Sequence, residues 1–528
     1  MTTAAPTPDL HQKRTIRLVF AALMLVMLLA SLSQTVLSTA LPTIVGSLDG
    51  ADHIAWVMTA YLLGMTVTMP MYGRLGDRLG RKPLLLLAIT LFTIGSLVGA
   101  IAQDMNVLIA GRAIQGLGGG GLMVLSQAAI ADVVPARERG KYMGILGAVF
   151  GLSSVAGPLL GGWFTEGPGW RWTFWINVPL GVIAFVAVVM LLAKPALERA
   201  QARVDYLGMA LLAIATSALI LGATWGGHQY DWDSPQIIGL GIVTVVGAIA
   251  FVLAERVAQE PVIPLALFRD RNFNLTTVGV IILGVAMFGS LSYLPTYLQM
   301  SVGVDATHAG LMMIPMMGGM LITSITVGQA VSRTGRYRWF PIAGAVVTGA
   351  GLFCLSTIDI GDSRWIIEGS LLVLGIGIGL GMQILTLIVQ NSFSHQIVGT
   401  ATAANNFFRQ VGGTLGAAAV GSIFTSRLTE TLATELPSTG RSGSGSSSLT
   451  PDAVAQLPQE LHDIVVGAYN EALMPIFLWI APLTLVSAAV LWFVHEKPLK
   501  HTIEAAKKDE SLGEHTLDAA EAMSGAER

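Results

Sequence analysis

Charged side chains are scarce in this sequence. They make up 12% of its 528 residues, whereas hydrophobic residues make up 53% and the mean hydropathy is +0.66. A water-soluble protein of this length carries roughly 25% charged residues to cover its surface. The shortage excludes the soluble globular class and predicts that a lipid bilayer solvates much of the chain.

Cysteine is scarcer still. Cys354 is the only one, so no disulfide can form within the chain, and its apolar neighbours indicate a small core residue. No metal-binding cluster and no pair of nucleophile and base is apparent, and the glycines at 118–121 lack the lysine of a phosphate-binding loop. We therefore expect no metal or other cofactor, no enzymatic activity, no ATP-driven step and no nucleic-acid partner.

Long apolar runs are abundant instead. A membrane-spanning helix needs roughly 20 mostly apolar residues. We predict 14 spans, near 16–38, 54–73, 83–103, 105–131, 141–162, 173–193, 207–226, 236–256, 274–299, 308–331, 339–359, 365–390, 399–424 and 473–493. A count of 12 is the alternative. The first run is longer than the apolar part of a secretory signal, so we expect a span there and not a cleaved signal.

Lys and Arg are distributed unevenly between the connections. Cytoplasmic loops of membrane proteins are enriched in these residues. They cluster after predicted spans 2, 4, 6, 8 and 10 and in the C-terminal tail, whereas the alternate connections carry acids such as Asp49, Asp104 and Asp305. The alternation predicts that both termini are cytoplasmic.

An internal repeat divides the chain. Residues 73–81 align without gaps with residues 328–336, at an offset of 255, and Gly140 falls on Gly399 at an offset of 259. Chance similarity among glycine-rich helices is the alternative explanation. We predict a tail at 1–15, a six-helix half at 16–193, two inserted spans with linkers at 194–273, a second six-helix half at 274–494 with an external loop at 425–472, and a polar tail at 495–528. Two parallel halves around a central path are a transporter architecture.

Five stretches carry a family resemblance, at 32–42, 73–82, 108–116, 151–162 and 170–179. Together they resemble the major facilitator superfamily and, within it, the 14-span drug:proton antiporters, over roughly residues 15–495. The resemblance implies an all-α major facilitator fold with two six-helix halves and two inserted helices. It also implies a monomer in the plasma (inner) membrane that exchanges a small hydrophobic or cationic substrate for protons.

The stretch at 73–82 contains the candidate conformational switch. Its glycines would allow a tight turn between two helices, and Asp77 could accept hydrogen bonds from backbone N–H groups at a helix start or pair with arginine. The candidate switch residues are Gly73, Asp77, Arg78, Gly80, Arg81 and, in the repeat, Arg333. Ser332 replaces Asp77 in the repeat, so a charged contact is expected only in the first half. The alternative is that this loop only orients and folds the protein.

Arg112 is the most informative charge, because it lies about seven residues, or roughly 10 Å, into a predicted span. Such a residue costs on the order of 3 kcal/mol on insertion scales and faces the protein interior. The resemblance implies a role in proton coupling for Arg112 and Gln115. Arginine itself cannot release a proton, so it would act on a neighbouring acid or bind a carbonyl. A fixed arginine that is hydrogen-bonded to backbone is the alternative.

The proton carrier is not evident from the sequence. Many members of the resembled family carry Asp in span 1, where this chain has Ser33. The remaining candidate acids are Glu368, Asp132, Asp104 and Glu471, and none of them lies near the centre of a predicted span.

Two further groups of residues are candidates. Pro158 removes one helix hydrogen bond and kinks span 5, and its neighbours Gly157, Gly161 and Gly162 would let another helix approach closely. We expect a hinge or seal there, with tight packing alone as the alternative. The cavity candidates are Asn405, Asn406 and Arg409 in span 13, with Gln34 and Gln383 as weaker ones.

The resulting hypothesis is an antiporter that exports hydrophobic or cationic compounds. The alternatives are export of an endogenous metabolite or lipid, and a membrane receptor or scaffold that transports nothing.

Overall fold

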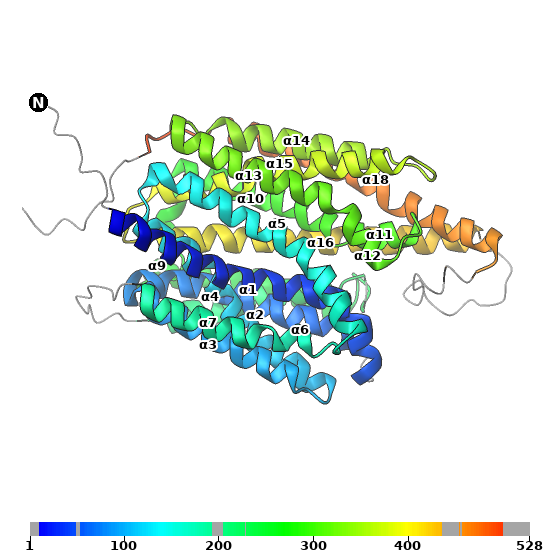
Figure 1. Cartoon of the computed structure of the whole chain (residues 1–528), viewed down its shortest axis with the longest axis horizontal. Coiled ribbons are helices and arrows are strands. Elements are labelled where there is room, and N and C mark those ends of the chain that lie inside the picture. Colours follow the sequence, from blue (N-terminus) through cyan, green and yellow to red (C-terminus); the bar gives the residue numbers. More distant parts are fainter. Residues whose placement is uncertain are drawn as a thin grey trace, which may run out of the picture.

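The computed structural model describes residues 10–48, 53–192, 204–227, 229–435, 454 and 457–499. Within these ranges the regular structure is helical, apart from one isolated bridge between Gly226 and Tyr230. Most of the long helices run roughly parallel to the long axis of the molecule and form one bundle (Figure 1). The expected N-terminal tail at 1–15 is shorter than predicted, because α1 begins at Leu10.

The first half of the bundle contains the elements up to residue 191. They are α1 (Leu10–Leu48), α2 (Ile54–Leu79), α3 (Arg81–Ala100), α4 (Met105–Val133), α5 (Ala136–Glu166), α6 (Trp172–Trp175) and α7 (Asn177–Leu191). The elements α8 (Tyr206–Trp225), α9 (Pro235–Val257) and the 3-10 helix η2 (Leu265–Arg269) follow, at the place of the predicted insert.

The second half contains the remaining elements. They are α10 (Arg271–Leu291), α11 (Leu294–Met300), α12 (Ala306–Met312), α13 (Ile314–Thr334), α14 (Trp339–Ser356), α15 (Arg364–Ser392), α16 (Val398–Glu435) and α18 (Gln459–Leu491). Each half has its own apolar core, one around Tyr61 and Phe92 and the other around Tyr297 and Phe477.

Short polar side chains determine where several helices begin. An Asp or Ser just before the first turn accepts a hydrogen bond from a backbone N–H that has no partner within the helix. The pairs are Asp104 with Val107, Asp205 with Gly208, Ser234 with Ile237, Asp270 with Phe273 and Asp305 with His308. At the other end of α13, Gly335 terminates the helix with a φ of 76°, a left-handed conformation that glycine adopts without strain.

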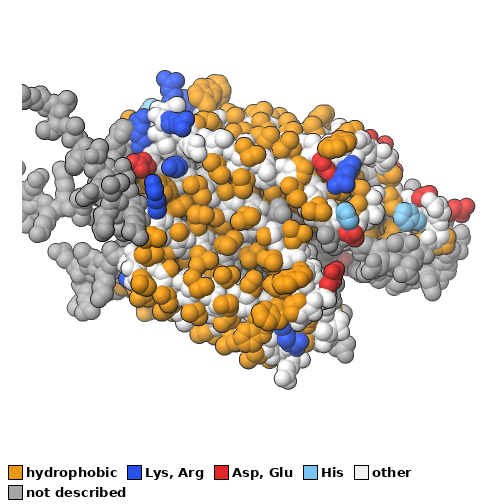
Figure 2. All heavy atoms as spheres, viewed as in Figure 1, with side chains coloured by type: hydrophobic (Ala, Val, Ile, Leu, Met, Phe, Trp, Pro, Cys, Tyr) orange, Lys and Arg blue, Asp and Glu red, His pale blue; other side chains and the backbone are white. Residues whose placement is uncertain are grey.

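Among the described residues, twelve helical stretches are long and apolar enough to cross a membrane. The long helices α2 and α16 are not among them, yet they pack against each other inside the bundle. A broad apolar band covers the visible face, and Lys and Arg gather mainly near its left end (Figure 2). We call this the basic end; it carries the α2–α3, α4–α5 and α13–α14 connections.

The expected external loop at 425–472 begins and ends with helical residues. Helix α16 continues to Glu435 and α18 begins at Gln459, so both helices extend beyond the rest of the bundle at its right-hand end (Figure 1). Hydropathy reports where a helix leaves the apolar layer, whereas the backbone hydrogen bonds of a helix continue unchanged in water. The glycine- and serine-rich stretch within this loop lies outside the described residues.

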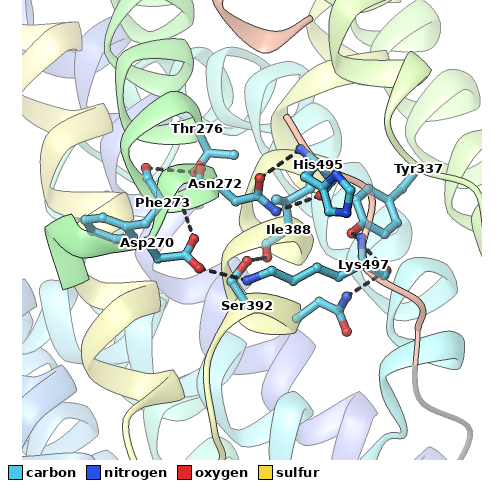
Figure 3. Close-up of polar contacts among 10 residues, drawn as sticks. Asp270, Asn272, Phe273, Thr276, Tyr337, Ile388, Ser392, His495 and Lys497 are labelled. Carbon is cyan, nitrogen blue, oxygen red and sulfur yellow. Dashed lines mark hydrogen bonds and ion pairs between the residues drawn. The ribbon is translucent and has the colours of Figure 1, made fainter. Parts of the chain in front are cut away.

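A C-terminal strap, residues 494–499, ties the second half together at the basic end (Figure 3). The side chain of Asn272 pairs with the backbone of His495 through two hydrogen bonds of 2.7 and 2.9 Å, and Lys497 forms an ion pair of 2.7 Å with Asp270. The Tyr337 hydroxyl donates to the Lys497 carbonyl and accepts from its N–H. Burial raises the pKa of Tyr337, so its hydroxyl keeps its proton at neutral pH.

This strap crosses the predicted boundary after residue 494. Its residues 495–499 were expected to belong to a polar tail, and they contact α10, the two residues before α14 and the end of α15. The rest of that tail, from 500 to 528, lies outside the described residues.

We predict that Asn272→Ala destabilises the protein by about 1–3 kcal/mol, because both backbone groups of His495 lose their partner in a partly buried place. Thermal unfolding of the purified protein in detergent measures the change. Thr326→Ala, which removes an exposed hydroxyl bonded only to its own helix, is the control and should shift the midpoint little. Equal midpoints for both variants would contradict a stabilising strap.

Candidate functional site: a central cavity and buried charges

A central cavity lies between the two halves. It is lined by α1, α2, α4 and α5 on one side and by α10, α13, α15 and α16 on the other. Three of the predicted cavity residues, Gln34, Gln383 and Arg409, line it. The other polar lining residues are Ser31, Ser324 and Gln410.

Methionine and phenylalanine form most of the remaining wall. The methionines are Met27, Met65, Met123, Met287, Met316, Met317, Met320 and Met382, and they are joined by Phe150 and Phe288. Thioether side chains are unbranched and polarisable, so they adapt to apolar surfaces of different shapes. Scattered methionines carry no sequence pattern of their own, and the sequence analysis did not identify them.

Among the described residues that line the cavity, Arg409 is the only charged one. Its side chain comes from α16 and is 5% exposed. Among the described residues, its one hydrogen bond goes from Nη2 to the sulfur of Met123, at 3.9 Å, and it forms no ion pair with a described carboxylate. A buried guanidinium without an acid is costly unless something else supplies its counter-charge.

The other two predicted cavity residues of α16 lie outside the cavity wall. Asn405 and Asn406 are both buried and precede Arg409 by about one turn, toward the basic end. Asn406 donates to the side chain of Gln127 in α4 at 2.9 Å, which joins the two halves. Gln390 of α15 also reaches the carbonyl of Gln127, at 3.3 Å. The sequence analysis missed Gln127, which is the centre of this polar layer.

Arg112 lies inside the first half and does not line the cavity. It is fully buried, its Nε donates to the Val57 carbonyl at 3.2 Å, and its guanidinium carbon sits 4.2 Å from the centre of the Tyr61 ring. Nη1 donates to Gln115 at 2.6 Å and to Ser33 at 3.3 Å. Among the described residues, Nη2 has no hydrogen-bond partner.

Ser33 and Gln115 complete this cluster. Gln115 donates to the hydroxyls of Ser33 and Ser96, at 2.9 and 2.8 Å. Ser33 thus occupies a place where an Asp would meet the guanidinium directly. A hydroxyl can accept the hydrogen bond but cannot neutralise the charge. Arg112 is therefore bonded to backbone and to two neutral polar side chains of its own half.

At the basic end, Asp77 joins the two halves. Its carboxylate is 1% exposed and accepts hydrogen bonds from the backbone N–H groups of Gly399 and Thr400, at 3.0 and 2.6 Å, and from the Thr400 hydroxyl at 2.7 Å. These groups form the N-terminus of α16, where the helix dipole favours a negative charge. Arg81 pairs with the same carboxylate at 3.1 Å.

A neutral copy of this contact occurs in the repeat. Ser332 of α13 accepts a hydrogen bond from the backbone N–H of Lys141, near the start of α5, at 3.0 Å. The close approach is repeated as well. A Cβ added to Gly73 would lie 2.9 Å from the Gly399 carbonyl, and one added to Gly140 would lie 2.9 Å from the Gly328 carbonyl. The positions that align at offsets of 255 and 259 therefore make matching contacts.

The predicted tight turn at 73–82 is mostly wrong. Helix α2 continues through Asp77 to Leu79, and only Gly80, with a φ of 85°, forms the bend before α3. Gly73 serves close packing instead, because its missing side chain admits Ala403 of α16. Arg78 forms an ion pair with Glu260 in the connection after α9, and Arg74 pairs with the same carboxylate.

The remaining switch and coupling candidates lie in different places. The Arg333 side chain is exposed and its carbonyl accepts from Arg137 at 2.9 Å. Asp132, at the end of α4, lies 2.9 Å from Arg81 and 3.0 Å from His395, so it contacts both halves. Glu368 lies in the second turn of α15, away from the cavity wall, and pairs with Arg364 at 2.6 Å.

The antiporter-motif residues pack against α1. A Cβ on Gly157 would contact Thr35, and one on Gly161 would contact Thr39 and the Val36 carbonyl. The expectation of close packing is wrong for Gly162, which has nothing within 4 Å of that position. Helix α5 runs unbroken through Pro158.

We predict that Asp77→Asn opens the basic end more often, because the neutral amide loses about 1–3 kcal/mol of charge-assisted hydrogen bonding to the start of α16. The measurement is labelling of Asn405→Cys by a thiol reagent, in a chain whose Cys354 is replaced by Ala. Ser332→Ala, which removes the neutral contact, should increase labelling less. Labelling that is no faster in Asp77→Asn than in the parent chain would refute the role of the charge.

Comparison with known proteins agrees with this architecture. The profile of the Major Facilitator Superfamily matches residues 23–417. An uncharacterized MFS-type transporter of Mycobacterium tuberculosis is 41% identical over 91% of this chain and 70% of its own length. The multidrug transporter protein MdtP of Bacillus subtilis is 34% identical over 93% of this chain and 94% of its own length.

A solved structure shows the same fold. The proton:xylose symporter XylE superposes with a TM-score of 0.63 at 15% identity, over 93% of this chain and 98% of that one. From the matched profile and these relatives, the chain belongs to the major facilitator superfamily of membrane transporters.

Proposed function

We propose that the protein is a secondary active transporter of the plasma membrane that exports hydrophobic drug-like compounds in exchange for protons. The observation that carries the proposal is a cavity lined from both halves and separated from the basic end by contacts between those halves. Rocking the halves would break these contacts and open the cavity to the other side. The multidrug transporter among the relatives supports drug-like substrates.

The membrane topology is part of the proposal. We count α2 and α16 as spans in addition to the twelve stretches, because each packs closely against neighbouring helices inside the bundle. This gives 14 spans, as two six-helix halves and an insert of α8 and α9. The basic end is then cytoplasmic, with both termini on that side, and a monomer carries a complete cavity.

The conformational switch is assigned to the contacts at the basic end. Asp77 and Ser332 each hold the start of a helix from the opposite half, and Arg81 orients the Asp77 carboxylate. Gly73 and Gly80 permit the close approach and the bend that these contacts need. In the state described here the cavity is closed toward the cytoplasm.

Proton coupling is assigned to Asp132 and, more indirectly, to Arg112 with Gln115. Asp132 is favoured among the candidate acids because it contacts Arg81 of its own half and His395 of the other. Opening the cytoplasmic side must separate at least one of these partners. Glu368 is less favoured, because Arg364 already pairs with it on the outer side. One proton moved across 100 mV supplies about 2.3 kcal/mol, roughly a fiftyfold concentration ratio.

We expect Arg112→Ala to reduce export at least about tenfold, because the variant loses a buried charge that we assign to proton coupling. Substrate binding should persist, because Arg112 lies behind the cavity wall and does not line the cavity. The measurement is efflux of a panel of hydrophobic drugs from proteoliposomes with and without a proton gradient. Arg171→Ala is the matched control, since Arg171 also combines one backbone hydrogen bond with an aromatic contact. Efflux that continues after the gradient is collapsed would sink proton exchange, and a scaffold would show no efflux at all.

Asp132→Asn should uncouple export from the gradient, because an amide keeps the contact with Arg81 but cannot exchange a proton. We expect downhill counterflow of substrate to persist and gradient-driven accumulation to fall about tenfold or more. Glu368→Gln is the comparison and should keep most of its activity. Full gradient-driven transport by Asp132→Asn would rule out this assignment.

A further inference from the structure

Among the described residues that line the central cavity, Arg409 is the only charged one, and the others are apolar or neutral and polar. We propose that the cavity binds lipophilic anions, with a carboxylate, sulfonate or phenolate on Arg409 and the apolar body among the methionines. This deepens the proposed export function, on which it rests, and replaces the expectation of a cationic substrate.

The partners of Arg409 leave room for such a ligand. A guanidinium presents five N–H donors in a planar fork that matches the two oxygens of a carboxylate. Among the described residues, only the Met123 sulfur accepts from it, at 3.9 Å, and thioether sulfur is a weak acceptor. Most of the donor capacity of this 95% buried side chain is therefore unused by the described chain.

Neutral polar groups are placed to complete an anion site. Gln410 follows Arg409 on α16, and Gln34 of α1 and Gln383 of α15 lie in the same wall. Amide side chains can donate hydrogen bonds to a carboxylate from their nitrogen atoms. Because they are neutral, they would orient the ligand while its negative charge pairs with Arg409.

Three described acids, Asp77, Asp132 and Glu368, are engaged outside the cavity wall. Asp77 is engaged with α16 and Arg81 at the basic end, Asp132 with Arg81 and His395, and Glu368 with Arg364 on the outer side. A cation in the cavity would thus meet Arg409 with no compensating carboxylate in the wall. Like charges in a poorly screened interior repel strongly.

The methionine-lined wall would contact the apolar part of the ligand. Eight methionines and two phenylalanines offer flexible apolar contacts without a fixed shape. Selection would then depend on charge and on overall size more than on the outline of the apolar body. The inferred class is an amphiphile with one anionic group and a sizeable apolar part.

The test uses three probes that share one apolar body and carry an anionic, a neutral and a cationic head group, namely pyrenebutyrate, pyrenebutanol and pyrenebutyl-trimethylammonium. Binding to the purified full-length protein in detergent is followed by calorimetry or pyrene fluorescence. We expect the wild type to bind the anion at least about tenfold more tightly than the cation. Arg409→Gln should weaken anion binding about tenfold or more and leave pyrenebutanol within about threefold.

Two control variants distinguish the effect of the Arg409 charge on binding from the effect of positive charge elsewhere on the protein. Arg427→Gln makes the same change on the same helix, 18 residues further along and roughly 27 Å away, and should leave all three affinities unchanged. Arg409→Lys keeps the charge without the fork and should bind the anion with intermediate affinity. It also serves as the test variant if Arg409→Gln does not fold.

Equal or tighter binding of the cation by the wild type would overturn the inference, as would unchanged anion binding by Arg409→Gln. Failure of all three probes to bind would overturn it too. Because binding is measured without transport, this outcome is separate from that of the export assay. Charge-selective binding without gradient-driven efflux would sink the proposed export and leave the anion site standing.

Discussion

The carboxylate of Asp77, seated on the first backbone N–H groups of α16, holds the basic end of the molecule together. The contact depends on three features at once. The helix start supplies a partial positive charge, Gly73 lets the two helix backbones come close, and Arg81 fixes the carboxylate. The pseudo-symmetric place in the other half has Ser332, so the same geometry is held there without charge. The two contacts thus differ in strength although they follow one plan.

Helix α16 links this contact to the cavity. Its first turn binds Asp77, its next turns carry the polar layer with Gln127, and Arg409 follows in the cavity wall. Movement of α16 relative to the first half therefore changes the closure of the basic end and the cavity together. The two buried arginines differ in how the surrounding protein compensates their positive charge. Arg112 donates from Nε and Nη1 to carbonyl, hydroxyl and amide oxygens of its own half and contacts the Tyr61 ring, whereas Arg409 has almost no partner in the described chain.

Much of this arrangement could be predicted from residues alone. A membrane bundle in two related halves was indicated by the apolar runs, the alternating clusters of Lys and Arg and the repeated motif. These three signals can be read from the sequence because they depend only on local composition or on spacing along the chain. The same reasoning failed where a helix continued past its apolar part. It ended α2 before Asp77 and ended α16 near residue 424, although both helices continue with solvated or paired side chains. The roles of the individual site residues stay predictions.

Sequence by itself determined that the chain is a helical membrane protein of two similar halves, since lipid solvation and the period of the repeat are properties of the residue order. Only the tertiary structure decided which polar residues meet. Arg409 enters the cavity while Asn405, four residues earlier, does not, and Asp132 finds His395 across the halves. Such pairings depend on how helices rotate and cross. Those are set by glycine contacts between segments that lie hundreds of residues apart.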